Sequence, residues 1–436
     1  MQTSLETLGE LERRLTMSVP VADIESEIQQ RLARLARNVK VPGFRPGKVP
    51  LKMVAQQYGP QVRSDVISDS LKNTFADAIR EQNLRIAGSP RIEPKAEAAA
   101  PDQLEFSATF EIYPEVKIGD LSSVTIERPQ AQVGPEDIER TIEMLRRQRT
   151  RYERVSRPAA VGDRAIVDFQ GKIGGTEFPG GQASDFPIVL GEARMLPQFE
   201  AAVAGMSAGE TRTFALTFPT DYHGKEVAGK DAEFTLTVKS VEAGTVPEVD
   251  ADFSRAFGIA SGNVDDLKAE IAANLKLELK RKIETKVKDQ VFAALRQHAL
   301  FVVPKSLVEI EARNMVQRAA AEMREQGMKP EDINLSPDAF RAAAESRVAL
   351  GLILSEVVRM EGLGAKPEQV KALVQEAAQT YEQPEAVVRW HYEKPERLNE
   401  FEALVVEHNV VAWVLARAKV VDRPTAFAEL MGTTRA

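Results

Sequence analysis

A winding apolar stripe in the second half of the chain constrains the fold more than any other sequence feature. Eight aliphatic residues recur there at every fourth position, the spacing of neighbours on one helix face. They are Leu267, Ile271, Leu275, Leu279, Ile283, Val287, Val291 and Leu295. Because an α-helix turns about 100° per residue, each four-residue step moves the stripe about 40° around the axis. No single flat partner can cover the whole run. Either several helices wrap it, or part of it stays open as an apolar binding groove.

The region around this stripe, from residue 246 to the end, has the pattern of helices throughout. Ser336 followed by Pro337 is typical of an N-cap and a first helical position, and Gly362 is typical of the end of the same helix. Three further prolines each open another predicted helix: Pro367, Pro384 and Pro395. We therefore expect an all-α C-terminal domain with extended helical arms over residues 246–436.

The first part of the chain mixes two periodicities. Apolar residues alternate at 11–19 and at 104–112, which predicts two half-buried strands. Between them, residues 24–39 have the apolar spacing of an amphipathic helix, and a second long helix is expected to follow Pro60. Strands that enclose helices predict an α+β domain over residues 1–112.

The middle of the chain divides into a connector and a β domain. Residues 113–151 begin with a proline-containing extended piece and continue as a charged helix, which is typical of a linker. Residues 152–245 alternate short strands with glycine-rich turns and include one short helical segment after Pro197. The strands are expected at 165–169, 211–218 and 233–238.

A basic window interrupts an otherwise acidic chain. Residues 31–52 contain seven Lys or Arg residues and no acid, although the whole chain has a net charge of −8. Within this window lies Gly-Phe-Arg-Pro-Gly-Lys-Val-Pro at 43–50, where Gly and Pro favour a turn. We expect this loop to join two helices, the second beginning near Pro50 and ending at Gly59. The window either faces an anionic partner such as nucleic acid, or is a solvated helix end followed by an ordinary turn.

Several chemistries are excluded or disfavoured by what the sequence lacks. There is no cysteine, so disulfides and thiol chemistry are excluded, and the four histidines form no paired metal-binding motif. We therefore expect no metal site and no cofactor. No phosphate-binding P-loop motif occurs, which argues against ATP use. The N-terminus has no leader pattern and no run of about 18 apolar residues occurs, so we expect a cytoplasmic protein without a membrane segment.

Three features in order resemble the bacterial trigger factor family. The loop at 43–50 resembles the ribosome-binding signature of that family. The middle domain resembles an FKBP-type prolyl isomerase in Val-Asp-Phe-Gln-Gly at 167–171, Asp-Phe-Pro-Ile-Val-Leu-Gly at 185–191 and Phe-Pro-Thr-Asp-Tyr-His-Gly at 218–224. The helical C-terminus completes the order, so that the resemblance covers essentially the whole chain.

The resemblance implies an ATP-independent chaperone at the nascent-chain exit of the large ribosomal subunit. Its partners would be a ribosomal protein and ribosomal RNA at the exit, nascent and unfolded polypeptides, and, for the free protein, a second copy of the chain. The ribosome-binding residues implied by position are Gly43, Phe44, Arg45, Pro46, Gly47 and Lys48. The linker would pack with the helical C-terminal body.

The resemblance also implies catalysis of cis–trans isomerisation at X-Pro bonds by an apolar pocket. The residues that would line this pocket are Phe169, Phe178, Phe186, Met195, Leu196, Phe199, Tyr222 and Phe234. Phe199 would form the floor, and the Leu196 amide and the Tyr222 hydroxyl would bond the substrate backbone. Without the resemblance, these aromatics would be interpreted as the ordinary core of a small β domain.

Two positions depart from the family patterns. Pro46 stands where relatives commonly carry a basic or polar residue, which removes a phosphate contact but stiffens the loop. Pro179 stands where the usual FKBP pattern has Asp, so that one polar contact of the pocket is lost.

Two other functions remain as alternatives. One is a free cytosolic prolyl isomerase whose helical arms recruit clients without any ribosome role. The other is an RNA-binding module, which is disfavoured because the basic residues do not continue beyond the loop. Tight binding to free RNA at moderate salt would favour that module.

Overall fold

The structure is a computed structural model that describes residues 2–39, 44, 49–95, 102–192, 194–222, 224–379, 381 and 383–432. It forms two compact units. Unit 1 consists of Met1–Arg128 with Thr285–Asp422, and unit 2 consists of Pro129–Glu284 with Arg423–Ala436. The predicted multidomain mixture of helices and sheets is confirmed.

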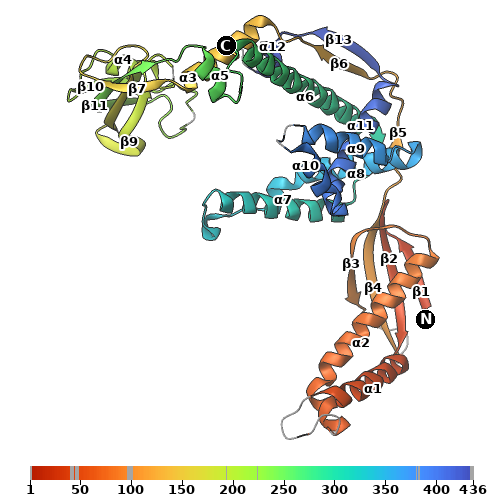
Figure 1. Cartoon of the computed structure of the whole chain (residues 1–436). Helices are drawn as coiled ribbons and strands as arrows, with labels where there is room; N and C mark the ends of the chain where they lie inside the picture. The colour runs from red at the N-terminus through yellow and green to blue at the C-terminus, as the bar shows by residue number, and fades with distance from the viewer. Residues whose placement is uncertain are drawn as a thin grey trace. The chain divides into compact units, whose positions relative to one another are not determined.

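The N-terminal part of unit 1 is an antiparallel sheet with two helices (Figure 1). Its strands are β1 (Gln2–Thr7), β2 (Glu12–Pro20), β4 (Gln103–Ile112) and β3 (Ile86–Pro94), in the order β1-β2-β4-β3. Helices α1 (Val21–Asn38) and α2 (Leu51–Glu81) pack their apolar faces on this sheet. Met17 on β2 is completely buried beneath them, as the alternating pattern of that strand predicts.

Helix α2 corrects one sequence prediction. The expected helix end at Gly59 is wrong, because α2 runs without a break through Gly59 and Pro60. Pro60 removes one backbone donor and disfavours a helix interior by ~3 kcal/mol. Val54, before the proline, and Val62, after it, are both buried in the same core. Burying each such side chain contributes roughly 1.5–3 kcal/mol, so packing on the sheet outweighs the local preference.

The rest of unit 1 is mostly helical. Its helices are α7 (Lys305–Glu325), α8 (Pro337–Glu361), α9 (Pro367–Ala378), α10 (Pro384–Tyr392) and α11 (Asn399–Leu415), with short 3₁₀ turns η1 (Pro330–Asp332) and η2 (Pro395–Leu398). The predicted caps of α8 are confirmed: the Ser336 hydroxyl accepts a hydrogen bond from the Asp338 N–H, and Gly362 is left-handed at φ 66°. In the part of the chain that the structure describes, no helix is long and apolar enough to cross a lipid bilayer.

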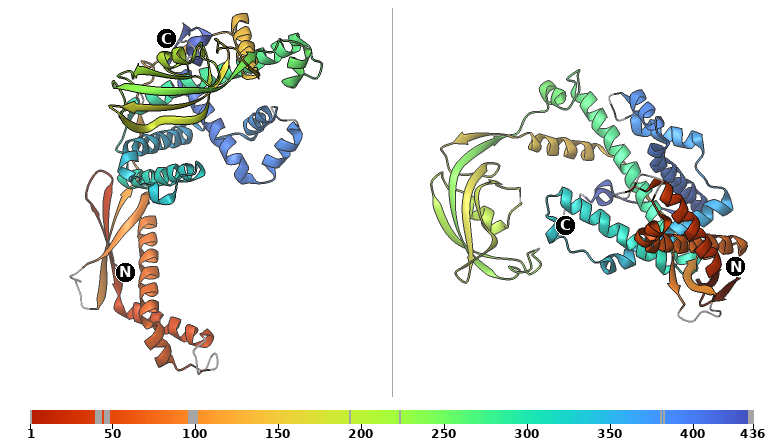
Figure 2. Two further views of the ribbon diagram at one scale, coloured as in Figure 1. Left: turned by 90° about the vertical axis from the view of Figure 1, so that its left-hand side faces the viewer. Right: turned by 90° about the horizontal axis from the view of Figure 1, so that it is seen from below.

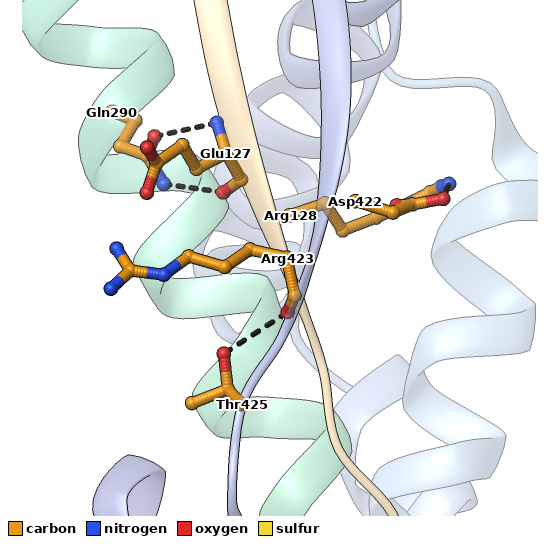
Figure 3. A network of polar contacts seen from close by, with 6 residues as sticks. All are labelled: Glu127, Arg128, Gln290, Asp422, Arg423 and Thr425. Carbon is orange, nitrogen blue, oxygen red and sulfur yellow. Dashed lines mark hydrogen bonds and ion pairs between the residues drawn. The ribbon is translucent and has the colours of Figure 1, made fainter.

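Two short strand pairs in this region join segments far apart in the sequence. β12 (Ala299–Leu300) pairs with β5 (Lys117–Ile118), and β13 (Lys419–Pro424) pairs with β6 (Thr125–Gln130). Figure 3 shows how β6 is held: the Gln290 side chain accepts a hydrogen bond from the Glu127 N–H at 2.9 Å and donates one to the Glu127 carbonyl at 2.7 Å. The helical pattern of residues 246–436 did not predict these strands, because their partners lie outside that region.

Unit 2 contains a five-stranded antiparallel sheet that curves around one helix (Figure 2). Its strands are β10 (Thr211–Thr217), β11 (Asp231–Thr245), β8 (Arg164–Ile173) and β9 (Thr176–Val189), with β7 (Arg151–Val155) paired to β11. The enclosed helix is α4 (Pro197–Val203). Its Phe199 and Val203 are buried in the core of the sheet, as expected for the single short helix of the β domain.

Helix α6 (Val264–His298) carries the winding stripe and passes from unit 2 into unit 1. Near its start, Leu267 and Ile271 pack with Ile142 of α3 (Pro135–Gln148) and Phe253 of α5 (Ala251–Ala256). Near its end, Val291 and Leu295 are completely buried. Leu275 and Ile283 are half-buried, and the other members of the stripe are buried. Burial by several neighbours is therefore observed over most of the stripe. The last described helix, α12 (Phe427–Met431), belongs to unit 2.

A carboxylate from the N-terminal sheet caps a helix of the helical part of unit 1. Glu111 of β4 accepts hydrogen bonds from the Lys305 and Ser306 N–H groups at the start of α7, at 3.2 and 2.7 Å. The Ser306 hydroxyl donates to the Ala87 carbonyl at 2.7 Å. The adjacent Gly88 has φ +83°, and a Cβ there would lie 2.8 Å from the Ser306 Cβ. A negative charge at a helix N-terminus is stabilising, so this joint fixes the sheet to α7.

Replacing Glu111 with Gln should loosen this joint. The amide keeps the shape but removes the charge, so amide hydrogen exchange at Lys305 and Ser306 should accelerate about tenfold, within the range of helix-cap energies. Hydrogen-exchange mass spectrometry of the full chain measures this. Glu115→Gln, which removes an exposed carboxylate nearby, serves as control, and unchanged protection in Glu111→Gln would contradict the role of the joint.

A clasp formed by Asp163 and Arg157 closes the turn before β8. Asp163 is 3% exposed, accepts hydrogen bonds from both terminal nitrogens of Arg157, and also accepts one from the Ala160 N–H at 2.9 Å. The hydrogen bond from Arg157 is the main cause that lowers the pKa of Asp163, against the opposing effect of burial. The clasp therefore stabilises the fold above the unfolded carboxyl pKa of about 3.9, and this stabilisation is lost as pH falls through the lowered value.

Asp163→Asn should consequently lower the thermal stability of unit 2 at pH 7 and have a smaller effect at pH 3. Below the unfolded carboxyl pKa of about 3.9, the unfolded wild-type chain binds a proton at Asp163, so the stabilisation by the ionised carboxylate shrinks and the two proteins converge. Calorimetry of the full chain at both pH values tests this. An equal gap in transition temperature at pH 7 and pH 3 would show that the charge of Asp163 does not stabilise the fold.

Candidate active site

Unit 2 contains an aromatic cavity of about 630 Å³ between the curved sheet, α4 and the loop after β10. Its described lining is mainly apolar, with a few charged residues at the rim. The lining residues are Phe169, Phe178, Pro179, Gly180, Arg194, Met195, Leu196, Pro197, Phe199, Leu216, Phe218, Tyr222, Gly224, Lys225, Glu226, Val227 and Phe234. A cavity of this size and character is typical of a small-ligand site.

Phe199 forms the floor of the cavity and is only 2% exposed. Its ring meets the rings of Phe169, Phe214 and Phe234 edge-on, with centroids 5.2, 5.4 and 5.5 Å apart. Edge-to-face geometry places the positive edge of one ring on the negative face of another and stabilises aromatic pairs by ~0.5–1.5 kcal/mol. The floor is thus held by its neighbours on three strands.

Polar groups at one side of the cavity come from the start of α4. Leu196 is the N-cap residue, and its carbonyl accepts hydrogen bonds from the Phe199 and Glu200 N–H groups at 2.8 and 3.2 Å. The Leu196 N–H has no hydrogen-bonding partner among the residues that the structure describes. The Glu200 carboxylate accepts a hydrogen bond from the Gly191 N–H at 3.1 Å, which anchors the loop that leads to Leu196. This arrangement leaves a backbone donor at the pocket wall.

Tyr222 lies on the opposite loop and is half-buried. Its ring packs on Phe218 with centroids 4.9 Å apart. Phe178, from β9, meets Phe218 edge-on at 6.0 Å. The aromatic walls of the pocket therefore include Phe178 from β9, Phe218 and Tyr222 from the loop after β10, and Phe234 from β11.

The structure brings together seven of the eight predicted pocket residues. Those that line the cavity are Phe169, Phe178, Met195, Leu196, Phe199, Tyr222 and Phe234. Phe186 does not line it and departs from the prediction. Its ring meets that of Phe169 edge-on at 5.7 Å, and the β8–β9 register pairs Phe186 with Val167, two positions before Phe169 along β8. Pro179 lies at the rim, at the position where the sequence predicted a lost polar contact.

Several lining residues were missed by sequence reasoning. Leu216 and Phe218 continue the alternation of β10 into the following loop, so their period-2 spacing was available as a signal. Lys225, Glu226 and Val227 lie in a loop without a local pattern. Lys225 and Glu226 are on the surface whereas Val227 is buried in the core, and these positions depend on how the loop folds.

The basic loop lies mostly outside the described residues. The residues outside are Gly43, Arg45, Pro46, Gly47 and Lys48. Their role in ribosome binding stays a prediction. Phe44 is described and is 38% exposed. Two further apolar side chains nearby, Leu51 and Met53 at the start of α2, are also exposed and were not predicted.

Comparisons with known proteins match all three parts of the chain. The family model "Bacterial trigger factor protein (TF)" matches residues 1–145, and the model of the trigger factor C-terminus matches residues 263–416. The model "FKBP-type peptidyl-prolyl cis-trans isomerase" matches residues 155–239, which contain the aromatic cavity.

Curated relatives match over the full length. The trigger factor of Aromatoleum aromaticum is 52% identical over 99% of both chains, and that of Azoarcus sp. is 51% identical over 99% of both. The trigger factor of Nitrosospira multiformis is 50% identical over 99% of this chain and 100% of its own. A solved trigger factor chaperone aligns with 95% of this chain at 18% identity and a TM-score of 0.48.

The full-length identity to these relatives and the order of the three matched family models agree with the resemblance drawn from the sequence. The chain belongs to the trigger factor family, and it is a ribosome-associated chaperone that carries an FKBP-type peptidyl-prolyl cis–trans isomerase domain.

Proposed function

We propose that the aromatic cavity of unit 2 is the isomerase site and that residues 43–48 anchor the chain to the large ribosomal subunit. Anchoring would use a ribosomal protein and ribosomal RNA beside the nascent-chain exit, in the cytoplasm. We assign ribosome binding to residues 1–112, a linker to 113–151, isomerisation to 152–245 and client binding to 246–436. The observation that carries the isomerase assignment is the buried floor of Phe199 within the FKBP-matched region.

Isomerisation of an X-Pro bond breaks no covalent bond, so the pocket needs to stabilise only a twisted imide. The barrier of ~18–20 kcal/mol comes from partial C–N double-bond character, which is weaker in the twisted, desolvated state. An apolar cavity walled by Phe169, Phe199 and Phe234 removes water from the proline ring. It therefore binds the transition state better than the planar substrate.

The backbone of the substrate needs a donor and a fixed orientation. The Leu196 N–H, which has no hydrogen-bonding partner among the described residues, would bond a substrate carbonyl at this wall. The Tyr222 hydroxyl is proposed to bond the substrate from the opposite loop. Pro179 supplies no side-chain polar group at the rim, so binding should depend more on apolar contact than in relatives with an acid there.

Ribosome anchoring is supported by the charge of the basic window and by the exposure of Arg34 and Lys52 among its described members. Its cations would contact phosphates, and such contacts make binding dependent on salt. The exposed ring of Phe44, together with Leu51 and Met53, offers apolar area next to them. Combined charge and apolar area suits a surface made of both RNA and protein.

Client binding is supported by large apolar side chains exposed on the helical part of unit 1. Met360, Tyr381, Trp390 and Tyr392 are each 45–63% exposed. Scattered apolar area of this kind binds unfolded segments without sequence specificity. We propose that the free protein self-associates through the same side chains.

Phe199→Ala should abolish isomerisation of a proline peptide while leaving suppression of aggregation largely intact. Removing the floor eliminates the ring contacts that shape the cavity, whereas the exposed apolar residues of unit 1 are unchanged. Because a Phe→Ala change in a core costs ~3–5 kcal/mol, folding of unit 2 must be checked by hydrogen exchange. Phe199→Leu is the milder variant and should retain partial turnover. Equal loss of both activities would refute the separation.

Phe44→Ala combined with Arg45→Ala should strongly reduce co-sedimentation with ribosomes. The double change removes an exposed ring and one cation from the loop, so residual binding should also depend less steeply on salt. Arg91→Ala, which removes one exposed cation from β3 in the same domain, is the matched control. Undiminished co-sedimentation of the double variant would favour the free isomerase alternative instead.

A further inference from the structure

The wall of the aromatic cavity contains two close approaches between a ring and a glycine. Gly171 of β8 lies directly opposite Phe234 of β11 in the strand register. A Cβ placed on Gly171 would lie 2.5 Å from Cε1 and 2.7 Å from Cζ of Phe234. The ring therefore lies across the Cα of Gly171. A second close approach lies within β9, where a Cβ on Gly181 would lie 2.9–3.0 Å from three ring atoms of Phe178 on the same strand.

Backbone conformation does not explain these two glycines. Neither has a positive φ, in contrast to Gly174 and Gly175 in the turn between β8 and β9 and to Gly180 within β9. Glycine in the interior of a strand weakens the strand, and it marks places where something approaches the backbone closely. At both positions, the approaching group is an aromatic ring that lines the cavity.

The ring of Phe234 has little freedom to move elsewhere. It is 5% exposed and contacts five other phenylalanines. These are Phe169, Phe178, Phe199, Phe214 and Phe218, with centroid separations of 5.5–6.4 Å. A side chain at position 171 would have to displace the ring by about 1 Å to reach ordinary contact distance. That displacement shifts the floor or reduces the cavity.

We propose that Gly171 and Gly181 are positioning residues of the isomerase, which set the cavity walls by the absence of a Cβ. This proposal rests on the assignment of the cavity as the isomerase site. Gly171 acts through Phe234, and Gly181 acts through Phe178. Neither glycine has a side chain to contact the substrate, so their effect on turnover is transmitted by the rings. Small displacements in a pocket that recognises a transition state have large effects on rate.

The test is a double-mutant cycle in the full-length chain, measured by isomerisation of a proline tetrapeptide. Gly171→Ala should lower kcat/KM about tenfold. In a Phe234→Leu background, where the shorter side chain relieves the clash, the same Gly171→Ala change should have less than a twofold effect. Gly351→Ala is the matched control, since Gly351 has an ordinary φ and nothing within 4 Å of its added Cβ, and it should leave turnover unchanged.

Each outcome of the cycle decides between positioning and another role. Unchanged kcat/KM in Gly171→Ala overturns the proposal, as does an equal loss in both backgrounds, because an effect of the added methyl group on the strand backbone, rather than on the ring, would not depend on residue 234. If Gly171→Ala fails to fold, the equivalent cycle of Gly181→Ala with Phe178→Leu decides. Retained turnover in Phe199→Ala would instead reject the cavity as the site, which separates that failure from failure of the glycine proposal.

Discussion

The winding apolar stripe of α6 is a constraint that both units share, because stripe residues are buried in each of them. A flat partner could cover only a short part of it, so its ends are buried in two different cores. Leu267 completes a core with Phe253 in unit 2, whereas Leu295 is buried in unit 1. The helix is thus shared by two units that are otherwise assembled from separate stretches of the chain. A stripe that ended earlier, or that stayed on one side of the helix, would leave the residues around Leu267 or those around Leu295 without an apolar partner on α6.

Local chemistry in the sequence accounted for much of the fold, while long-range pairing accounted for the errors. The caps of α8 were predictable because Ser336 and Gly362 act on their own neighbours. The break expected at Gly59 failed because the sheet beneath α2, formed by distant strands, holds both halves of the helix. Strand β13 had no local signal, since it exists only through pairing with β6.

The candidate site shows the same division. Aromatics within the resembling motifs, such as Phe169 and Tyr222, were predictable as lining. Phe186 was not distinguishable from them by pattern, because its pairing with Val167 and its contact with Phe169 depend on the register of β9 against β8. The glycine at 171 was visible in the motif, but its relation to Phe234 depends on pairing between β8 and β11. This pocket is defined by the arrangement of apolar side chains from several strands rather than by reactive groups. Such an arrangement is difficult to predict from the order of residues in the sequence.

The capped joint between Glu111 and Ser306 has a consequence for how the chain itself is made. These residues are 195 positions apart in the sequence. At a synthesis rate of ~5–20 residues per second, the sheet that carries Glu111 emerges roughly 10–40 s before its helical partner exists. During that interval the N-terminal sheet has only its own core, shared with α1 and α2, to hold it together. A chaperone of nascent polypeptides is thus itself a nascent chain whose N-terminal domain is synthesised well before the helix that it caps.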